Sequence, residues 1–208
     1  MKNALKITAA ALCCLALVAC SQKGPAEAAL KTAETSMNEV KAEGAKYAPE
    51  QTKGLMTSYT AAQDSFNRGD YKAAMEIAQG IPAKAKDVSA AVATKKDELT
   101  KAWTSLASTV PAQVDQIKAK VGELAAMNVK KLPKGMDAAQ VETAKTSLAD
   151  ITKSWGDAAD AFKAGALADA VSKGNAVKAK VGEAMAALGL TAAAPAPAAA
   201  AAATAAKK

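Results

Sequence analysis

The sequence contains no histidine, so it offers no imidazole for acid–base catalysis, for a Ser-His triad or for metal binding. It also contains no Ser-x-x-Lys, the common signature of a serine–lysine nucleophile. The carboxylate pairs Asp97-Glu98 and Asp157/Asp160 fall outside the apolar helix positions, where solvation explains them better than metal binding or acid catalysis. We therefore expect no enzymatic activity, no metal and no cofactor.

Aromatic residues are equally scarce, at 3% of the chain, although half of all residues are apolar. Alanine supplies much of that apolar fraction, and alanine favours helices while burying little area. This combination predicts a shallow core of Ala, Val, Leu and Met between long, closely spaced helices. The few aromatic residues are expected to be core anchors and not ligand platforms.

Arginine is nearly absent as well, since Arg68 is the only one among 27 basic residues. The net charge is +7, or +5 without Lys2 and Lys6, and lysines alternate with acidic residues along the predicted helices. Nucleic-acid binding usually needs arginine and clustered aromatics, so we expect no nucleic-acid partner. The lysines are interpreted as solvating helix surfaces, the alternative being weak attraction to anionic headgroups or wall polymers.

Only three cysteines are present, and all lie near the N-terminus, at positions 13, 14 and 20. Lys2 and Lys6 precede an uncharged run from 7 to 19, the pattern of a secretory signal peptide and too short for a transmembrane helix. Cleavage after residue 19 would leave Cys20 as the sole cysteine. An exported domain would then be stable without disulfides.

The end of this run, Leu17-Val18-Ala19-Cys20, resembles the lipobox of bacterial lipoproteins at all four positions. The resemblance implies that Cys20 is lipidated on its thiol, becomes the mature N-terminus and is acylated on its amine, with palmitate among the expected chains. Membrane lipid is then the first expected partner. Ser21, which is not the Asp that retains such proteins in the inner membrane, indicates the outer membrane of a Gram-negative bacterium, with the body facing the periplasm.

The rest of the chain has apolar residues in a 3-4 rhythm that predicts helix after helix. We expect an all-α, elongated antiparallel helical bundle with two three-helix units joined by a long helix. The expected segments are a signal peptide at 1–19, a lipidated tether at 20–25, unit 1 at 26–82, a connecting helix at 83–110, unit 2 at 111–190 and a disordered Ala/Pro/Lys tail at 191–208.

Local signals mark the expected helix ends. Pro49 suits the first turn of a helix, Gly69 and Gly165 suit left-handed caps, and Asp137 with Gln140 forms a capping-box pattern. Gly189 should end the last helix, with the next residue folding back onto Met185. Whether the helix that follows Gly69 continues through Pro82 is left open by the sequence.

Two passages repeat each other. Tyr59 to Ala74 aligns with Trp155 to Ala170 at a constant separation of 96 residues (155 minus 59). A different separation relates 118–123 to 178–183, which are identical in sequence and are explained equally well by compositional bias. The first match predicts a duplicated helix–corner–helix element.

Tyr47-Ala48-Pro49 and the corner Gly69-Asp70-Tyr71-x-x-Ala74 resemble an uncharacterised family of helical bacterial lipoproteins, a domain of unknown function, over about residues 26 to 80. The resemblance implies no activity. The corner is also similar to that of tetratricopeptide repeats, but their 34-residue period is absent, so peptide binding in a groove is a secondary hypothesis.

The C-terminal Lys208 is similar to the terminal lysine that the murein lipoprotein joins to peptidoglycan. Lys208 is therefore a candidate site of cell-wall attachment, and peptidoglycan or another envelope protein is an expected partner. The sequence predicts a structural or protein-interaction role. The alternative is a carrier that holds an apolar ligand or peptide in a cavity lined by residues such as Met37, Met75, Trp155 and Met185.

Overall fold

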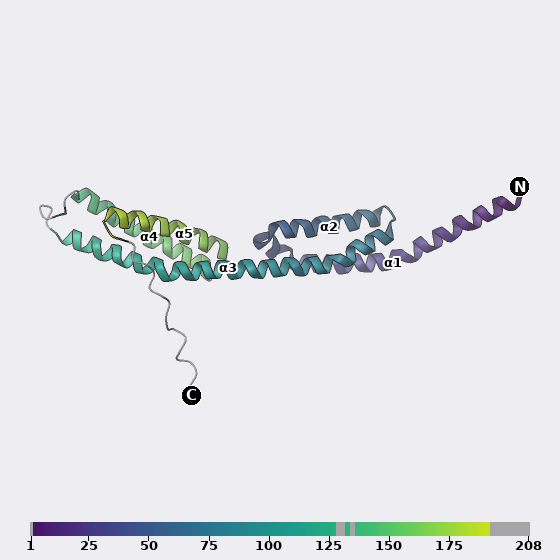
Figure 1. The fold of residues 1–208 in the computed structure, drawn as a ribbon, viewed down its shortest axis with the longest axis horizontal. Coiled ribbons are helices and arrows are strands. Elements are labelled where there is room, and N and C mark those ends of the chain that lie inside the picture. The colour runs from purple at the N-terminus through teal and green to yellow at the C-terminus, as the bar shows by residue number, and fades with distance from the viewer. Residues whose placement is uncertain (1, 128–131, 134–135, 192–208) are drawn as a thin grey trace, which may run out of the picture. The chain divides into compact units, whose positions relative to one another are not determined.

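The computed structural model describes residues 2–127, 132–133 and 136–191, with side chains from residue 22 onward. These residues form a bundle of helices and contain no strand, which confirms the all-α prediction (Figure 1). The helices are α1 (Lys2–Tyr47), α2 (Pro49–Asn67), α3 (Tyr71–Ala126), α4 (Ala138–Lys163) and α5 (Leu167–Ala187).

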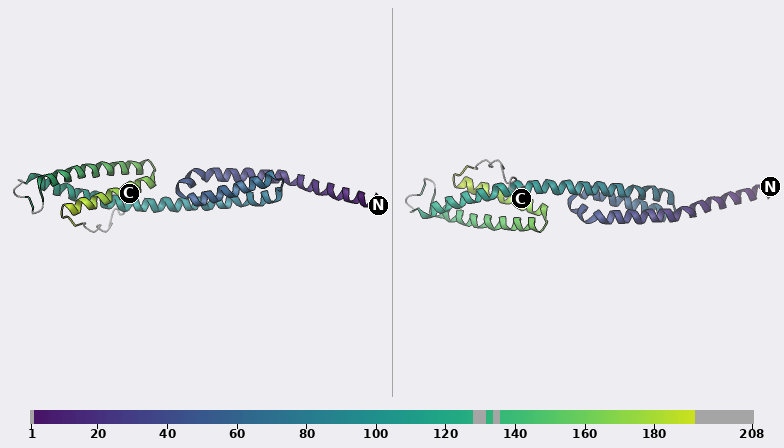
Figure 2. Two further views of the ribbon diagram at one scale, coloured as in Figure 1. Left: turned by 90° about the horizontal axis from the view of Figure 1, so that it is seen from above. Right: turned by 90° about the horizontal axis from the view of Figure 1, so that it is seen from below.

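The chain divides into two compact units, Met1–Asp97 and Glu98–Lys208. Unit 1 contains α1, α2 and the first part of α3, and unit 2 contains the rest of α3 with α4 and α5. Within the units, α2 lies beside α1 and α5 lies beside α4 (Figure 2). Each unit therefore consists of three helical segments, as the sequence predicted.

Helix α3 continues through Pro82, which the sequence left open, and also through Pro111, where a helix end was predicted; residues 83–110 are therefore not a separate element. A proline inside a helix costs about 3 kcal/mol because it removes a hydrogen bond and crowds the preceding turn. The neighbouring Ile81 and Val110 are fully buried. Burial of the residue before each proline offsets that local cost.

Helix α1 begins at Lys2 and includes residues 20–25, which the sequence predicted as a tether. Pro25 lies inside this helix, and Ala26 is the first buried residue among the described side chains. The packed part of α1 therefore begins where the first helix of unit 1 was predicted to begin. Among the described residues, no helix has the length and apolar character needed to cross a membrane.

Small side chains bring the helices of unit 1 close together. Ala33, Ala62 and Ala74, one from each helix, are fully buried. At Gly44 an added Cβ would lie 2.4 Å from Thr52 Oγ1 and 2.8 Å from Val88 Cγ1. The core is as shallow as the alanine content predicted, and α1 can approach its neighbours this closely only where it carries glycine.

Unit 2 has a more apolar core, formed by side chains from α3, α4 and α5. Its buried members are Leu106, Val110, Ile117, Val121, Leu124, Val141, Ile151, Val177, Val181, Met185 and Leu188. The predicted capping box begins α4, because the Asp137 carboxylate accepts from Gln140 N–H at 2.8 Å and the Gln140 carboxamide accepts from Asp137 N–H at 2.9 Å.

The corners after α2 and α4 have the same hydrogen bonds. The N–H groups of Arg68, Gly69 and Asp70 donate to the carbonyls of Asp64, Phe66 and Ser65, and the residues 96 positions later repeat all three bonds. Gly69 and Gly165 both have positive φ, 82° and 74°. This backbone identity supports the predicted duplication, and Asp70 caps α3 through a bond from Ala73 N–H to its carboxylate at 3.1 Å.

Burial follows the same 96-residue separation beyond the corner. The buried pairs are Leu55 and Ile151, Ala62 and Ala158, Ala74 and Ala170, Ile81 and Val177, Ala85 and Val181, and Val92 and Leu188. Buried residues in the first helical segments of the two units match at a different separation, 77 residues (110 minus 33). This separation pairs Ala33 with Val110 and Tyr47 with Leu124. The helices of unit 2 therefore repeat those of unit 1, with 19 more residues (96 minus 77) between the matched positions of the first and second helices.

Candidate functional site

The predicted lipidation motif lies on α1. Leu17, Val18, Ala19 and Cys20 are part of the helix Lys2–Tyr47, and their side chains precede the part of the chain for which side chains are described. Residues 23–25 are exposed, and packing against other helices begins at Ala26. The motif is therefore followed by a short exposed stretch and then by the folded body. Lys208 lies outside the described residues.

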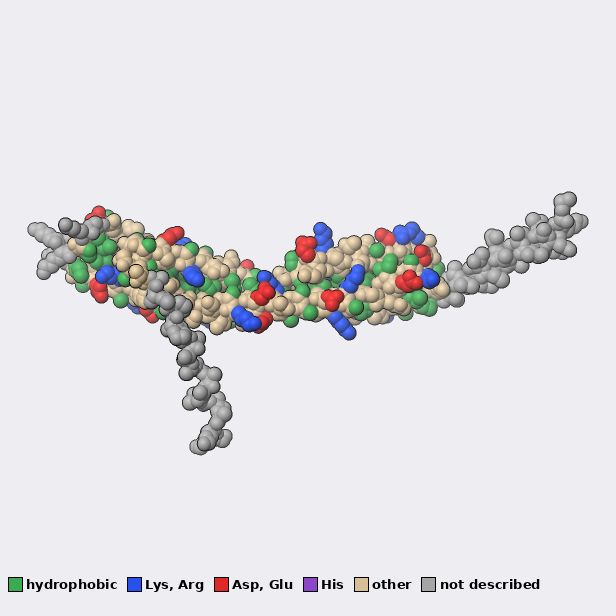
Figure 3. All heavy atoms as spheres, in the orientation of Figure 1, with side chains coloured by type: hydrophobic (Ala, Val, Ile, Leu, Met, Phe, Trp, Pro, Cys, Tyr) green, Lys and Arg blue, Asp and Glu red, His purple; other side chains and the backbone are tan. Residues whose placement is uncertain are grey.

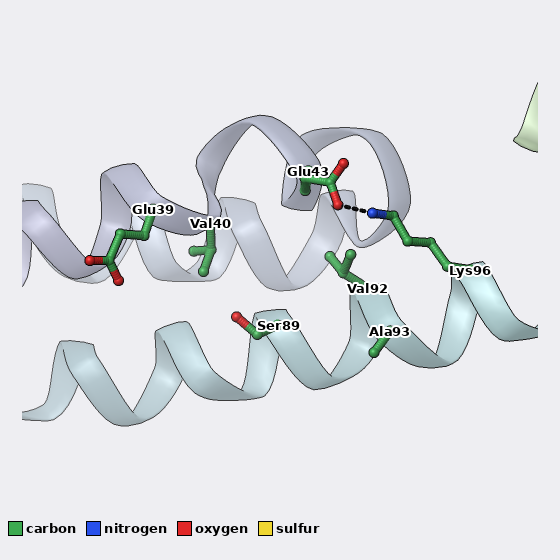
Figure 4. Close-up of a pocket in the computed structure, with 7 residues that line it drawn as sticks. All are labelled: Glu39, Val40, Glu43, Ser89, Val92, Ala93 and Lys96. Atoms are coloured by element: carbon green, nitrogen blue, oxygen red, sulfur yellow. Dashed lines mark hydrogen bonds and ion pairs between the residues drawn. The ribbon is translucent and has the colours of Figure 1, made fainter. Parts of the chain in front are cut away.

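A groove between α1 and α3 in unit 1 was not anticipated from the sequence (Figure 4). Its volume is about 290 Å³, and its lining residues are Glu39, Val40, Glu43, Ser89, Val92, Ala93 and Lys96. The Glu43 carboxylate and the Lys96 ammonium form an ion pair across it. Lys96 Nζ also lies 5.2 Å from the centre of the Tyr47 ring.

The Lys96 ammonium therefore has two favourable electrostatic contacts, one with a carboxylate and one with an aromatic face. The pair is partly exposed, so its contribution to stability is small, within about 1 kcal/mol. The groove is at the lower limit of small-molecule sites, which are roughly 300–1,000 Å³. Its chemistry is that of a surface cleft closed by an ion pair.

One titratable group in unit 1 is perturbed. Tyr59 on α2 is half-buried, and its hydroxyl accepts a hydrogen bond from Gln63 Nε2 at 3.0 Å. Burial raises the pKa of Tyr59 above 10.0, the Glu34 carboxylate raises it further, and the bond from Gln63 lowers it. Burial and repulsion explain the shift without a catalytic role.

The residues predicted to line a carrier cavity are divided between the units. Met37 and Met75 belong to unit 1, whereas Trp155 and Met185 belong to unit 2. Met185 is part of the unit 2 core, and Trp155 stacks on Trp103 with ring centroids 5.1 Å apart. Trp103 also stacks on Phe162 at 5.0 Å. These side chains pack against other side chains of the chain itself. This packing agrees with the expectation that the aromatic residues are core anchors.

The acidic pairs singled out in the sequence are exposed, and Asp160 forms an ion pair with Lys163 at 3.1 Å. Within the described part of the chain, no three His, Cys, Asp or Glu residues come together as metal ligands. On the face shown in Figure 3, basic and acidic side chains are interspersed over the helices.

The chain matches no protein-family model, and no curated protein or solved structure is similar to it. The resemblance of residues 26 to 80 to an uncharacterised lipoprotein family therefore stays a prediction, as does the similarity of the corner to tetratricopeptide repeats.

Proposed function

We propose that this protein is a lipoprotein of the Gram-negative cell envelope, anchored in the outer membrane through Cys20, whose periplasmic body has a structural or protein-interaction role. The observation that carries the proposal is the motif Leu17-Val18-Ala19-Cys20, placed directly after a basic N-terminus and an uncharged apolar run. Several acyl chains, at about 0.8 kcal/mol per buried methylene, would hold such a body durably on a membrane.

The start of the folded body supports this assignment. Six positions separate Cys20 from Ala26, and the described side chains at 23–25 are exposed. Cleavage before Cys20 would therefore leave in place every side chain of unit 1 that the structure describes.

An interaction role is favoured over a carrier role because the two cores are filled by their own side chains. Alanine and glycine bring the helices of unit 1 together, and stacked aromatics fill the end of unit 2. The described surface grooves are open to solvent: the one in Figure 4 has a volume of about 290 Å³, and one along α2 has a volume of about 540 Å³. A co-purifying apolar ligand at one per chain, seen by native mass spectrometry, would instead favour the carrier.

Lys208 extends the same proposal to the cell wall, because it is similar to the terminal lysine through which murein lipoprotein is joined to peptidoglycan. Mass spectrometry of digested, purified sacculi tests this: the expected product is a C-terminal peptide carrying a muropeptide on Lys208. Recovery of that peptide only in its free form from the detergent fraction would contradict attachment.

The anchor is tested by Cys20→Ser in cells supplied with labelled palmitate. The variant should lose the label, keep the mass of an unlipidated chain and leave the detergent phase. Cys13→Ser is the matched control, since it removes another thiol near the same motif and should leave the label in place. A Cys20→Ser protein that stays membrane-bound at wild-type mass would overturn the proposal.

A further inference from the structure

One face of α2 points away from the unit 1 core and forms a continuous stripe. We call it the α2 stripe, and its members are Lys53, Met56, Thr57, Thr60, Ala61 and Asp64. Successive members are alternately three residues and one residue apart in the sequence, which places them on a single helix face. Together with Ala45, Pro49 and Thr52 they line a groove of about 540 Å³, and Met56 is 40% exposed.

The middle of the stripe is more apolar than its sequence indicates. Thr57 Oγ1 donates to the Lys53 carbonyl at 3.0 Å, and Thr60 Oγ1 donates to the Met56 carbonyl at 3.1 Å. With both hydroxyls bonded to their own helix, the threonines can offer their methyl groups to a partner. The stripe is thus an apolar centre, Met56 to Ala61, with one basic and one acidic end.

The duplication shows that this face is not required by the fold. In unit 2, the residues 96 positions later are Thr152, Lys153, Gly156 and Asp157, where unit 1 has Met56, Thr57, Thr60 and Ala61. All four lie exposed on α4. Because the same helix position is polar in one copy and apolar in the other, the stripe needs an explanation specific to α2.

The order of residues along the stripe is self-complementary. Lys53 and Asp64, Met56 and Ala61, and Thr57 and Thr60 are each centred on the peptide bond between Ser58 and Tyr59. Lys53 and Asp64 are eleven residues apart, about 16 Å along the helix, so they are too distant to pair with each other. In an antiparallel helix pair with its two-fold axis at that bond, Lys53 of each copy lies opposite Asp64 of the other.

We propose that the α2 stripe binds the α2 stripe of a second copy of this chain in an antiparallel, two-fold contact. Met56 then covers Ala61 of the second copy, and the threonine methyl groups meet at the axis. A contact of one helix per copy is smaller than the roughly 1,600 Å² of a standard interface, so the affinity is modest. The contact needs only unit 1 and does not depend on a lipid anchor.

The test is sedimentation equilibrium of the purified full-length chain in density-matched detergent, up to about 1 mM, where even a millimolar dissociation constant populates the dimer. The wild-type chain should show a monomer–dimer equilibrium. Lys53→Asp and Asp64→Lys each place like charges opposite one another and should weaken dimerisation about tenfold. The double variant should restore it, because each charge again meets its opposite on the second copy.

Two further variants use the duplicated copy as a reference. Ala61→Asp introduces the residue found at Asp157 and should weaken the dimer, whereas Lys153→Asp on α4 changes the net charge by the same amount as Lys53→Asp and should leave the dimer unchanged. Thermal unfolding by circular dichroism verifies that each variant is folded. A wild-type chain that is monomeric throughout, a double variant that fails to recover, or a Lys153→Asp variant as weak as Lys53→Asp would each overturn the proposal.

Discussion

Gly44 should be the position in unit 1 that least tolerates an added methyl group. A Cβ there would lie 2.4 Å from Thr52 Oγ1 and 2.8 Å from Val88 Cγ1. Thr52 is buried, and its hydroxyl donates to the Ala48 carbonyl at 2.8 Å. Because Thr52 is β-branched and buried, it can make room only by breaking this bond or by moving α2 away from α1.

The expected change in the free energy of unfolding is the sum of one stabilising and two destabilising contributions. Alanine gains about 1 kcal/mol over glycine in a helix interior. Overpacking costs roughly 1–3 kcal/mol, and a buried hydroxyl left without its partner costs about 1–3 kcal/mol more. We therefore expect Gly44→Ala to lower the free energy of unfolding by about 1–5 kcal/mol, against the sign that helix propensity alone would give.

Urea unfolding followed by far-ultraviolet circular dichroism measures this change. Gly80→Ala on α3 is the matched control, since its Cβ would meet nothing within 4 Å, and it should stabilise by about 0.5–1 kcal/mol. In a Thr52→Ala background, Gly44→Ala should cost less because the closest contact is gone. If Gly44→Ala unfolds at the same or higher urea concentration than wild type while Gly80→Ala behaves as expected, the steric argument is refuted.

Three other perturbations test the remaining structure. Trp103→Leu removes the ring held between two aromatic neighbours and should cost about 2–4 kcal/mol, with loss of the near-ultraviolet circular dichroism of stacked tryptophan; an unchanged spectrum would contradict the stack. Asp137→Ala removes the capping box and should cost about 1 kcal/mol by urea unfolding, whereas a neutral effect would show that α4 does not depend on it. Tyr59 should ionise above pH 10.0 in a titration of tyrosinate absorbance, with Tyr59→Phe identifying its signal. Because its folded pKa is raised, the stability it supports is complete below pH 10.0 and is lost as pH rises through the folded value, and Glu34→Gln should move that value downward.

Helix ends were predictable because their causes are local. The Asp137 box needs only two residues three positions apart, and the corners at Gly69 and Gly165 need a residue that tolerates positive φ. The 3-4 spacing of apolar residues likewise identified most of the buried face, since helix periodicity is written directly in the sequence.

The failures have non-local causes. The break expected at Pro111 is absent, and α3 also continues through Pro82, because burial of Val110 and Ile81 offsets the local cost of each proline. The ion pair between Glu43 and Lys96 joins residues 53 positions apart and depends on the register of α1 against α3. No sequence pattern fixes that register, so the groove that the pair closes could not be foreseen.

The glycine that ends α5 bears on how such a chain could grow. Gly189 has φ 65°, and the N–H of Leu190 returns to the Met185 carbonyl at 2.8 Å, which stops the helix. At the 96-residue separation, its counterpart is Ala93, where α3 continues and becomes the first helix of unit 2. Alanine at this position lets the last helix of one copy serve as the first helix of the next, so tandem duplication needs no new linker. Glycine at the same position ends α5 instead.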